Sequence, residues 1–399
     1  MKEEKRSDPQ PTPELGEAAF TAVAEAALDR QPVSGSTHNF YRYPARFSPR
    51  FAAAVIEHFS RPGDLIADPY MGGGTAIVEA LVAGRRVVGN DLNSLATFIT
   101  KVKITPLTPA EVASIREWVL RNVPGFGYRT PPENIAPFID PVKTRNLSLV
   151  RARFIKKAVA AALASIEELP SANARDFAKC ALLRVSQWAL DGRERHTPLA
   201  DFRGNLAFTS EEMLLAIVAL ANRIDEGGGH ATLLNVDAAV LDREPIFSEP
   251  TNRVKLVVTS PPYPGVHVLY HRWQVDGRRE TPAPYWITGC NDGKGASFYN
   301  FGDRRQQAAD NYFRTSLLTL QSIRRIMADG GFIVQMVAFN RPHDQLPRYL
   351  ANMQLAGFEE AAAGSDERIW RQVPNRKWHA RQRGITHSAN EVVLVHRAV

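Results

Sequence analysis

The chain has 399 residues, of which 44% are hydrophobic, 23% charged and 9% aromatic. This length exceeds the ~150 residues of a typical domain and the composition is globular, which excludes both a single small module and a mainly disordered chain. Its 49 basic and 42 acidic residues leave a net charge of +7. A moderate basic excess suits a polyanionic partner, but many enzymes of small molecules are equally basic.

Several further classes of protein are disfavoured. No uncharged apolar stretch approaches the ~18 residues that span a bilayer, and the charged N-terminus lacks the apolar core of a signal peptide. We therefore expect a cytoplasmic protein with no membrane partner. The two cysteines, Cys180 and Cys290, form no CxxC pair, which argues against a disulfide scaffold and a zinc finger. His267 and His271 have helical spacing but no further ligand beside them, so we expect no metal.

The N-terminal region predicts a tail followed by the first units of a sheet. Residues 1–14 are charged and proline-rich without periodicity, so we expect residues 1–30 to hold a disordered tail and a leading helix. From Gly63 onward, short apolar runs alternate with helical stretches, which is typical of parallel βαβ units. Residues 31–104 are therefore expected to form a first half-domain, with elements at 65–67 (strand), 75–83 (helix), 87–89 (strand) and 94–102 (helix).

A helical block separates this half-domain from a second one. Residues 105–229 contain no run with strand character, and their periodicity predicts helices at 109–119, 147–168, 174–189 and 210–224. The alternation returns in residues 230–399, with elements expected at 256–258 (strand), 308–327 (helix), 332–334 (strand) and 391–396 (strand). The sequence thus predicts an α/β fold in which a helical insertion divides one sheet domain.

A glycine-rich turn, ADPYMGGGT at 67–75, lies between the first strand and its helix. Consecutive glycines let the backbone approach a ligand and leave helix N-terminal N–H groups free. The turn lacks the lysine of a P-loop, which argues against ATP hydrolysis. Asp91 ends the next strand, near the ~20-residue offset at which Rossmann-like folds bind ribose hydroxyls. Either feature alone fits a capped turn, but together they predict a nucleoside pocket.

A second motif, TSPPY at 259–263, directly follows the strand at 256–258. Two prolines hold backbone carbonyl oxygens rigidly at the carboxyl end of a strand, where they can accept hydrogen bonds from an amino group. Ser260 adds an adjustable acceptor, and Tyr263 adds a ring on which a planar base can stack. The alternative interpretation is a proline-rich loop with a buried tyrosine.

The two motifs together resemble those of the amino-group DNA methyltransferases, and Gly72, Gly74 and Thr75 match the first motif residue by residue. The resemblance implies a Rossmann-like methyltransferase fold with a mostly parallel seven-stranded sheet, S-adenosylmethionine as cofactor and DNA as substrate. Residues 38–47 resemble the segment that closes over the methionine part of the cofactor, and residues 235–237 the acidic turn beside its adenine. In this family, serine at the start of the second motif is associated with cytosine N4, and aspartate or asparagine with adenine N6.

The motifs and the resemblance imply a set of site residues. The expected catalytic residues are Ser260, Pro261, Pro262 and Tyr263. The expected cofactor-binding residues are Tyr43, Pro44, Asp68, Tyr70, Gly72, Gly74, Thr75, Asp91, Asn93, Asp237 and Thr259.

Basic stretches predict where DNA would lie. Residues 143–157 and 368–383 each contain six Lys or Arg and no acid, and residues 266–286 combine basic and aromatic side chains directly after the second motif. The first stretch equally fits the polar face of a helix, and the second a solvated hairpin. The expected DNA-binding residues are Arg272, Arg278, Arg279, Arg371, Arg376, Lys377 and Arg381.

The sequence therefore predicts a site-specific DNA methyltransferase that modifies the N4 of a flipped-out cytosine. Cytosine C5 methylation needs a thiolate, usually in a Pro-Cys pair, and neither Cys180 nor Cys290 follows a proline. The alternatives are adenine-N6 methylation, RNA amino-methylation and a non-catalytic DNA-binding protein. A cognate restriction endonuclease is a candidate partner, and residues 105–229 are a candidate DNA-recognition element.

Overall fold

The computed structural model describes residues 16–31, 33–43, 46–127, 131–193, 195–264, 272–277, 279–291, 301, 306–339, 341–361, 368–372 and 390–399. The tail predicted at residues 1–14 lies outside them. The helices are α1 (Glu17–Leu28), α2 (Pro49–Phe59), α3 (Thr75–Val82), α4 (Ser94–Ile104), α5 (Pro109–Asn122), α6 (Pro132–Ile135), α7 (Arg153–Ile166), α8 (Ala172–Leu190), α9 (Leu199–Gly227), α10 (Ala283–Thr288), α11 (Gln306–Ile326) and α12 (Pro342–Leu355). The strands are β1 (Leu65–Asp68), β2 (Arg86–Asn90), β3 (His230–Leu234), β4 (Val254–Thr259), β5 (Trp273–Val275), β6 (Arg279–Thr281), β7 (Met327–Ala338), β8 (Phe358–Glu360), β9 (Trp370–Gln372) and β10 (Asn390–Ala398).

One mostly parallel sheet of eight strands organises the fold, and seven of them follow the order β3-β2-β1-β4-β7-β10-β8. Strand β10 runs antiparallel to β7 and β8, and β9 pairs with another part of β10. The strand order reverses beside β1, which pairs in parallel with both β2 and β4. Open α/β sheets bind ligands at the carboxyl ends of their strands at such a switch point. The expected mostly parallel central sheet is confirmed, but it has eight strands rather than seven, because β9 also pairs with β10.

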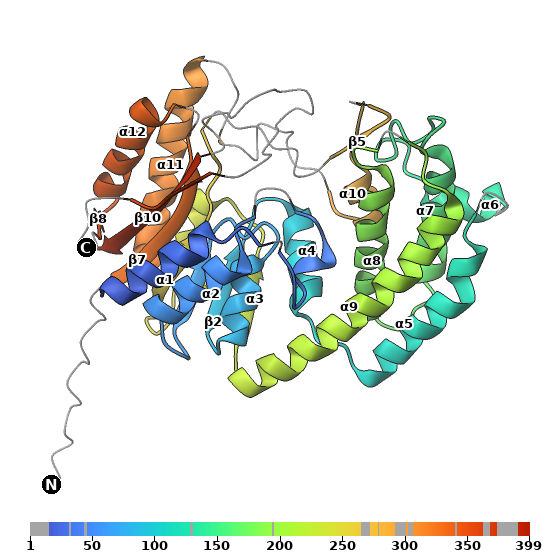
Figure 1. Ribbon diagram of the computed structural model, residues 1–399, viewed down its shortest axis with the longest axis horizontal. Helices are drawn as coiled ribbons and strands as arrows, with labels where there is room; N and C mark the ends of the chain where they lie inside the picture. The colour runs from blue at the N-terminus through green and yellow to red at the C-terminus, as the bar shows by residue number, and fades with distance from the viewer. Residues whose placement is uncertain are drawn as a thin grey trace, which may run out of the picture.

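Helices cover both faces of this sheet (Figure 1). Because side chains alternate along a strand, β4 sends Leu256 and Val258 into a core shared with α1, α2 and α3, and Val257 into a core shared with α11 and α12. All three side chains are fully buried. The sheet is therefore the middle of three layers, and its carboxyl edge stays accessible between them.

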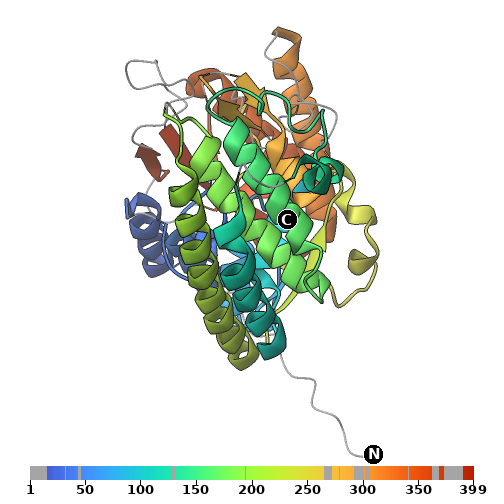
Figure 2. The ribbon, with the colours of Figure 1, turned by 90° about the vertical axis from the view of Figure 1, so that its right-hand side faces the viewer.

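The residues between α4 and β3 form a helical lobe beside the sheet (Figures 1 and 2). Helices α5, α7, α8 and α9 lie where periodicity predicted helices, although α9 begins at Leu199, well before residue 210, and residues 147–152 form turns. Ser171 caps α8 and Thr108 with Glu111 forms a capping box on α5. Within the described ranges, the helix Leu199–Ile224 is long and apolar enough to cross a membrane, but its inner face packs in the lobe's core.

A short segment from the second half of the chain joins this lobe. Hairpin β5–β6 and helix α10 pack against α8, and their side chains Trp273, Tyr285 and Trp286 are buried in the core of the helical lobe. The Trp273 indole N–H also donates to the Tyr41 hydroxyl at 3.0 Å. The lobe is therefore built from two parts of the sequence that lie on either side of β4.

We predict that Trp273→Ala destabilises the protein by about 3 to 5 kcal/mol, because it removes a buried indole and leaves a cavity. The matched control is Trp188→Ala in α8, whose residue is 39% exposed and whose loss should change the free energy of unfolding by less than about 1 kcal/mol. Urea denaturation of both variants measures the difference. Equal losses would contradict the packing of the hairpin in the lobe.

Candidate active site

A cleft opens at the carboxyl edge of the sheet, where the order of strands reverses. Its empty space amounts to about 830 Å³ when the open solvent at its mouth is counted. Five segments meet there, namely the residues before α2, the turns after β1, β2 and β3, and the turn after β4, and Phe301 adds a side chain from a sixth. The lining residues include Tyr43, Arg46, Phe47, Tyr70, Met71, Gly72, Gly73, Thr75, Asn90, Asp91, Asn93, Asp237, Ser260, Pro262 and Phe301.

The glycine turn forms the floor of this cleft and depends on the absence of side chains. Gly74 has a φ of +70°, and a Cβ on it would stand 2.5 Å from Thr100 Oγ1. A Cβ on Gly72 would stand 3.0 Å from the ring of Tyr43. The buried Lys103 ammonium donates to the Gly73 carbonyl oxygen from below. The turn is therefore fixed from behind while its front faces the cleft.

Asp91 and Asn93 follow β2 and brace the glycine turn. One Asp91 carboxylate oxygen accepts the Gly72 N–H at 2.9 Å, and the other accepts the Asn93 N–H at 2.8 Å. Burial raises the pKa of Asp91 to about 6. The Asn93 side chain caps α4, accepts from the Tyr285 hydroxyl at 2.6 Å and donates to the Tyr43 hydroxyl at 3.2 Å. Each Asp91 oxygen keeps a further lone pair for a hydroxyl donor.

The neighbouring turns are joined by a buried asparagine. Asn90 donates to the carbonyl oxygens of Pro69 and Val236, at 3.2 and 3.1 Å. Its own side-chain oxygen accepts from the Val236 backbone N–H at 3.1 Å. Asp237, the next residue, is exposed at the cleft and caps a short helical turn through the Ala239 N–H. The positions of three separate turns are therefore set by one amide side chain.

Asp68 and Thr259 bind each other beneath the cleft rather than lining it. The Thr259 hydroxyl donates to a carboxyl oxygen of Asp68 at 2.6 Å, and the Tyr70 backbone N–H donates to the same oxygen at 3.1 Å. Asp68 is 1% exposed, and this burial raises the pKa of its carboxyl to about 7. The pair joins the end of β1 to the end of β4, and so fixes the glycine turn relative to the TSPPY turn.

The TSPPY turn presents two of its residues to the cleft. Ser260 and Pro262 are among the lining residues, whereas Pro261 and Tyr263 are buried. The Pro262 carbonyl oxygen accepts from the Tyr312 hydroxyl of α11 at 2.8 Å. Ser260 Oγ lies 3.0 Å from the Tyr263 hydroxyl oxygen, which in turn donates to Glu391 at 2.9 Å. The turn is therefore held by side chains from two other elements.

The structure thus brings most of the expected cofactor and catalytic residues to one cleft. Those that line it are Tyr43, Tyr70, Gly72, Thr75, Asp91, Asn93, Asp237, Ser260 and Pro262. The expected residues that lie behind its wall are Asp68, Gly74, Thr259, Pro261 and Tyr263. Pro44 lies outside the described residues. The second group supports the wall of the cleft rather than facing a ligand.

The expected DNA-binding residues fall into three groups. Arg272 and Arg279 are on the hairpin that packs against the helical lobe, each 3.6 Å from a carboxylate, of Glu280 and Asp276 respectively. Arg371 lies in β9, is only 15% exposed and pairs with Glu391 at 2.6 Å. This burial does not favour contact with a phosphate, because a phosphate must approach from solvent. The remaining residues, Arg278, Arg376, Lys377 and Arg381, lie outside the described part of the chain.

Sequence reasoning missed several residues that shape the site. Gly73 lines the cleft, and Asn90 joins the turns around it. The available sequence signal for Asn90 was a polar residue at the end of an apolar strand, just before Asp91. Glu391, a charge at the start of an apolar strand, was a similar signal. Lys103 gave no signal in the sequence, because a lysine three residues after Thr100 also fits the polar face of an ordinary helix. Among the described residues, no group of three or more His, Cys, Asp or Glu is placed to hold a metal ion.

Comparison with known proteins finds similarity over the segment that carries the glycine turn. Residues 23–100 match the family model N6_N4_Mtase, described as DNA methylase. The chain is 38% identical over 80 residues to Type II methyltransferase M.MvaI of Kocuria varians, covering 19% of this chain and 18% of that protein. It is 30% identical over 67 residues to Type II methyltransferase M.MjaII of Methanocaldococcus jannaschii, covering 17% and 13%. The predicted resemblance to the amino-group DNA methyltransferases is therefore confirmed.

These matches have a limited extent. The aligned segments span less than a fifth of the length of either curated relative. Solved structures that align over more of the chain include TrmN from Thermus thermophilus, with 12% identity over 88% of this chain and 49% of that chain and a TM-score of 0.31. The rRNA methyltransferase aviRa from Streptomyces viridochromogenes has 11% identity over 93% and 94%, with a TM-score of 0.35. Likenesses this weak say nothing about the substrate of this chain.

We predict that Asp68→Asn reduces the pH dependence of stability. Because the folded pKa of about 7 lies above the ordinary value of 3.8, the folded state holds an extra proton between these values. Its stability therefore falls by up to about 1.4 kcal/mol for each pH unit as pH rises through that window. Asparagine keeps an acceptor for Thr259 without the charge. Urea denaturation of wild type and variant at pH 5, 6, 7 and 8 should show the variant gaining relative stability as pH rises.

The matched control is Asp329→Asn, which removes a carboxylate whose side chain is 89% exposed. A constant difference between wild type and Asp68→Asn from pH 5 to pH 8 would contradict the raised pKa of Asp68.

Proposed function

We propose that this protein is an S-adenosylmethionine-dependent DNA methyltransferase that modifies the exocyclic N4 of cytosine. The observation that carries this proposal is the single cleft lined by both the glycine turn and the Ser260–Pro262 edge of the TSPPY turn. A nucleoside-binding surface and a set of amino-group acceptors thereby face the same space. The family match over residues 23–100 and the Type II methyltransferases among its relatives support DNA as the substrate.

The glycine side of the cleft fits the proposed cofactor. Side-chain-free backbone at Gly72 and Gly73 would cradle it, and a Cβ at either position would crowd Tyr43 at 3.0 Å. Asp91 would accept hydrogen bonds from ribose hydroxyls, because its oxygens keep free lone pairs behind their backbone contacts. The bound cofactor supplies a methyl group already activated on a sulfonium. The cleft residues would therefore only bind, orient and exclude water.

The TSPPY side of the cleft supplies acceptors for an amino group. The exocyclic nitrogen of cytosine is a poor nucleophile because its lone pair is delocalised into the ring. Hydrogen bonds from this amino group to acceptors on the cleft edge of the TSPPY turn, with Ser260 Oγ as the side-chain acceptor that lines the cleft, would favour a pyramidal nitrogen with its lone pair directed at the methyl group. Holding reactants in attack geometry can supply on the order of 7 to 11 kcal/mol. The chain's contribution is thus alignment rather than a covalent intermediate.

A base inside a duplex cannot reach this cleft, so the proposed reaction requires base flipping, which costs a few kcal/mol. The helical lobe and its hairpin lie beside the sheet and carry basic residues such as Arg151 and Arg279. They are the proposed recognition element. A cytoplasmic location and a cognate restriction endonuclease belong to the same proposal.

Product analysis tests the proposal directly. Purified protein is incubated with tritiated S-adenosylmethionine and, separately, with unmethylated DNA and with RNA, and the digested nucleosides are identified by mass spectrometry. We expect N4-methylcytosine in DNA. N6-methyladenine alone would establish adenine specificity, and label only in RNA would establish an RNA methyltransferase. Cofactor binding without transfer to any nucleic acid would support a non-catalytic protein.

We predict that replacements on the two sides of the cleft separate binding from transfer. Pro262→Ala should lower kcat by at least about a hundredfold, because a loosened turn misplaces the acceptors, and should change the Kd for the cofactor by less than about twofold. Asp91→Ala should weaken cofactor binding by at least tenfold, the loss expected for about 1.4 kcal/mol or more of hydrogen bonding. Calorimetric titration and steady-state methylation measure both. Parallel losses of binding and kcat in Pro262→Ala would show that its turn belongs to the cofactor site.

A further inference from the structure

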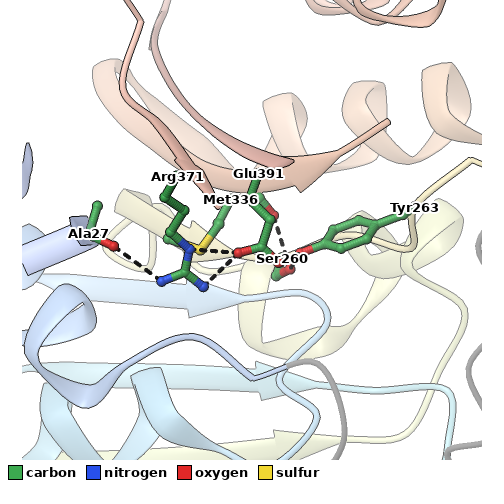
Figure 3. A network of polar contacts seen from close by, with 6 residues as sticks. All are labelled: Ala27, Ser260, Tyr263, Met336, Arg371 and Glu391. Carbon is green, nitrogen blue, oxygen red and sulfur yellow. Dashed lines mark hydrogen bonds and ion pairs between the residues drawn. The ribbon is translucent and has the colours of Figure 1, made fainter. Parts of the chain in front are cut away.

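A buried ion pair lies directly behind the TSPPY turn (Figure 3). Glu391 is the second residue of β10, and Arg371 lies opposite it in β9 as its register partner in the sheet. The Arg371 guanidinium contacts Glu391 Oε2 at 2.6 Å through both Nε and Nη2. Their side chains are only 15% and 3% exposed. Arg371 Nη1 also donates to the Ala27 carbonyl oxygen of α1 at 3.3 Å, which fixes the guanidinium from a third element.

The second oxygen of Glu391 reaches the catalytic turn. The Tyr263 hydroxyl donates to Glu391 Oε1 at 2.9 Å. The Tyr263 oxygen lies 3.0 Å from Ser260 Oγ, and Ser260 Oγ also donates to the Met336 carbonyl oxygen at 3.0 Å. An uninterrupted chain of polar contacts therefore runs from the guanidinium to the serine that lines the cleft.

The number of hydroxyl protons in this network of polar contacts determines the direction of its hydrogen bonds. A carboxylate paired with a guanidinium only accepts, so the single Tyr263 hydroxyl proton is directed at Glu391. Tyr263 cannot then donate to Ser260. The single Ser260 proton is directed at Met336 or at the Tyr263 oxygen, and in both cases away from the cleft. Ser260 Oγ is left with lone pairs for a donor that enters the cleft.

We propose that Glu391 and Arg371 are positioning residues that orient the Tyr263 hydroxyl, so that Ser260 acts as a hydrogen-bond acceptor for the amino group of the target base. This inference rests on the proposed function. It assigns Arg371 a role in the site rather than on a DNA phosphate. It also gives this buried charged pair a role other than stability, since buried ion pairs are often replaceable by apolar residues without loss of stability.

A double-mutant cycle on kcat tests whether Glu391 acts through Tyr263. Glu391→Gln permits the side-chain amide to donate to Tyr263, which reverses the hydrogen bonds toward the serine. Tyr263→Phe removes the hydroxyl that carries the effect. We expect each single variant to lower kcat at least tenfold, with the KM for DNA and the Kd for the cofactor within twofold of wild type. The double variant should be no slower than the slower single variant. Multiplicative losses would overturn the inference.

The matched control is Glu360→Gln in β8, which breaks a carboxylate–guanidinium pair with Arg368 at 2.6 Å on the same edge of β10. Its kcat should stay within twofold of wild type. A loss in this control equal to that in Glu391→Gln would assign the effect to general weakening of the sheet edge.

The dependence of DNA binding on salt separates the two roles of Arg371. Loss of a phosphate contact lowers the slope of log K against log salt by about one. We expect the charge-removing variant Arg371→Met with Glu391→Gln to keep the wild-type slope and to lose kcat instead. A reduced slope with unchanged kcat would make Arg371 a DNA contact. Both partners are replaced because removing Arg371 alone would leave a buried carboxylate unpaired. Arg371→Lys keeps the positive charge, so it leaves the slope unchanged in either role and is used only to measure the expected loss of kcat.

A spectroscopic measurement tests the contact between Glu391 and Tyr263 independently of catalysis. The full chain is labelled with 3-fluorotyrosine, and the ¹⁹F resonance of residue 263 is identified by its loss in Tyr263→Phe. This resonance should shift in Glu391→Gln and stay unchanged in Glu360→Gln. An unchanged resonance in Glu391→Gln overturns the inference whatever the activity. If the resonance shifts but the wild-type protein methylates no amino group, the proposed function fails, and with it the proposed role of Glu391 and Arg371 in catalysis. The contact between Glu391 and Tyr263 would still be established.

Discussion

The hydrogen bond between Thr259 and the buried Asp68 is the contact on which the site depends. It spans 191 residues of sequence at 2.6 Å and joins β1 to β4 where the sheet order reverses. Each of these strands is followed by one of the two turns that line the cleft. Because the bond lies below both turns, it fixes their separation without occupying the space between them. Alignment of two reactants, which the proposed reaction needs, is a consequence of that fixed separation.

Two further contacts join the helical lobe to the side of the cleft that carries the glycine turn. Trp273 donates to Tyr41 at 3.0 Å, and Tyr285 donates to Asn93 at 2.6 Å. Asn93 in turn contacts Tyr43, which covers the glycine turn. The segment that follows the TSPPY turn therefore packs in the lobe and is hydrogen-bonded to the wall of the cleft. Movement of the lobe would disturb the residues that hold the glycine turn.

Local patterns predicted the elements well where periodicity and glycines define them. The strands around Ile66, Val88, Val257 and Ile333 are apolar runs bounded by turns, and all four are present in the sheet. Strand β3 carries a weaker signal, since it is only partly buried, and the three-residue strands β8 and β9 are too short to predict. Basic composition indicated contact with DNA at Arg371, yet composition does not say that a carboxylate lies opposite in the next strand.

The sequence by itself determined the α/β class, the helical insertion and the two motifs, because each depends on residues that are neighbours along the chain. It also determined the resemblance to the amino-group DNA methyltransferases. Only the tertiary structure decided which motif residues face the cleft and which support it. Asp68 and Thr259 satisfy each other, and Tyr263 turns toward Glu391, because buried polar groups bind the nearest partner in space and long-range pairing sets that partner.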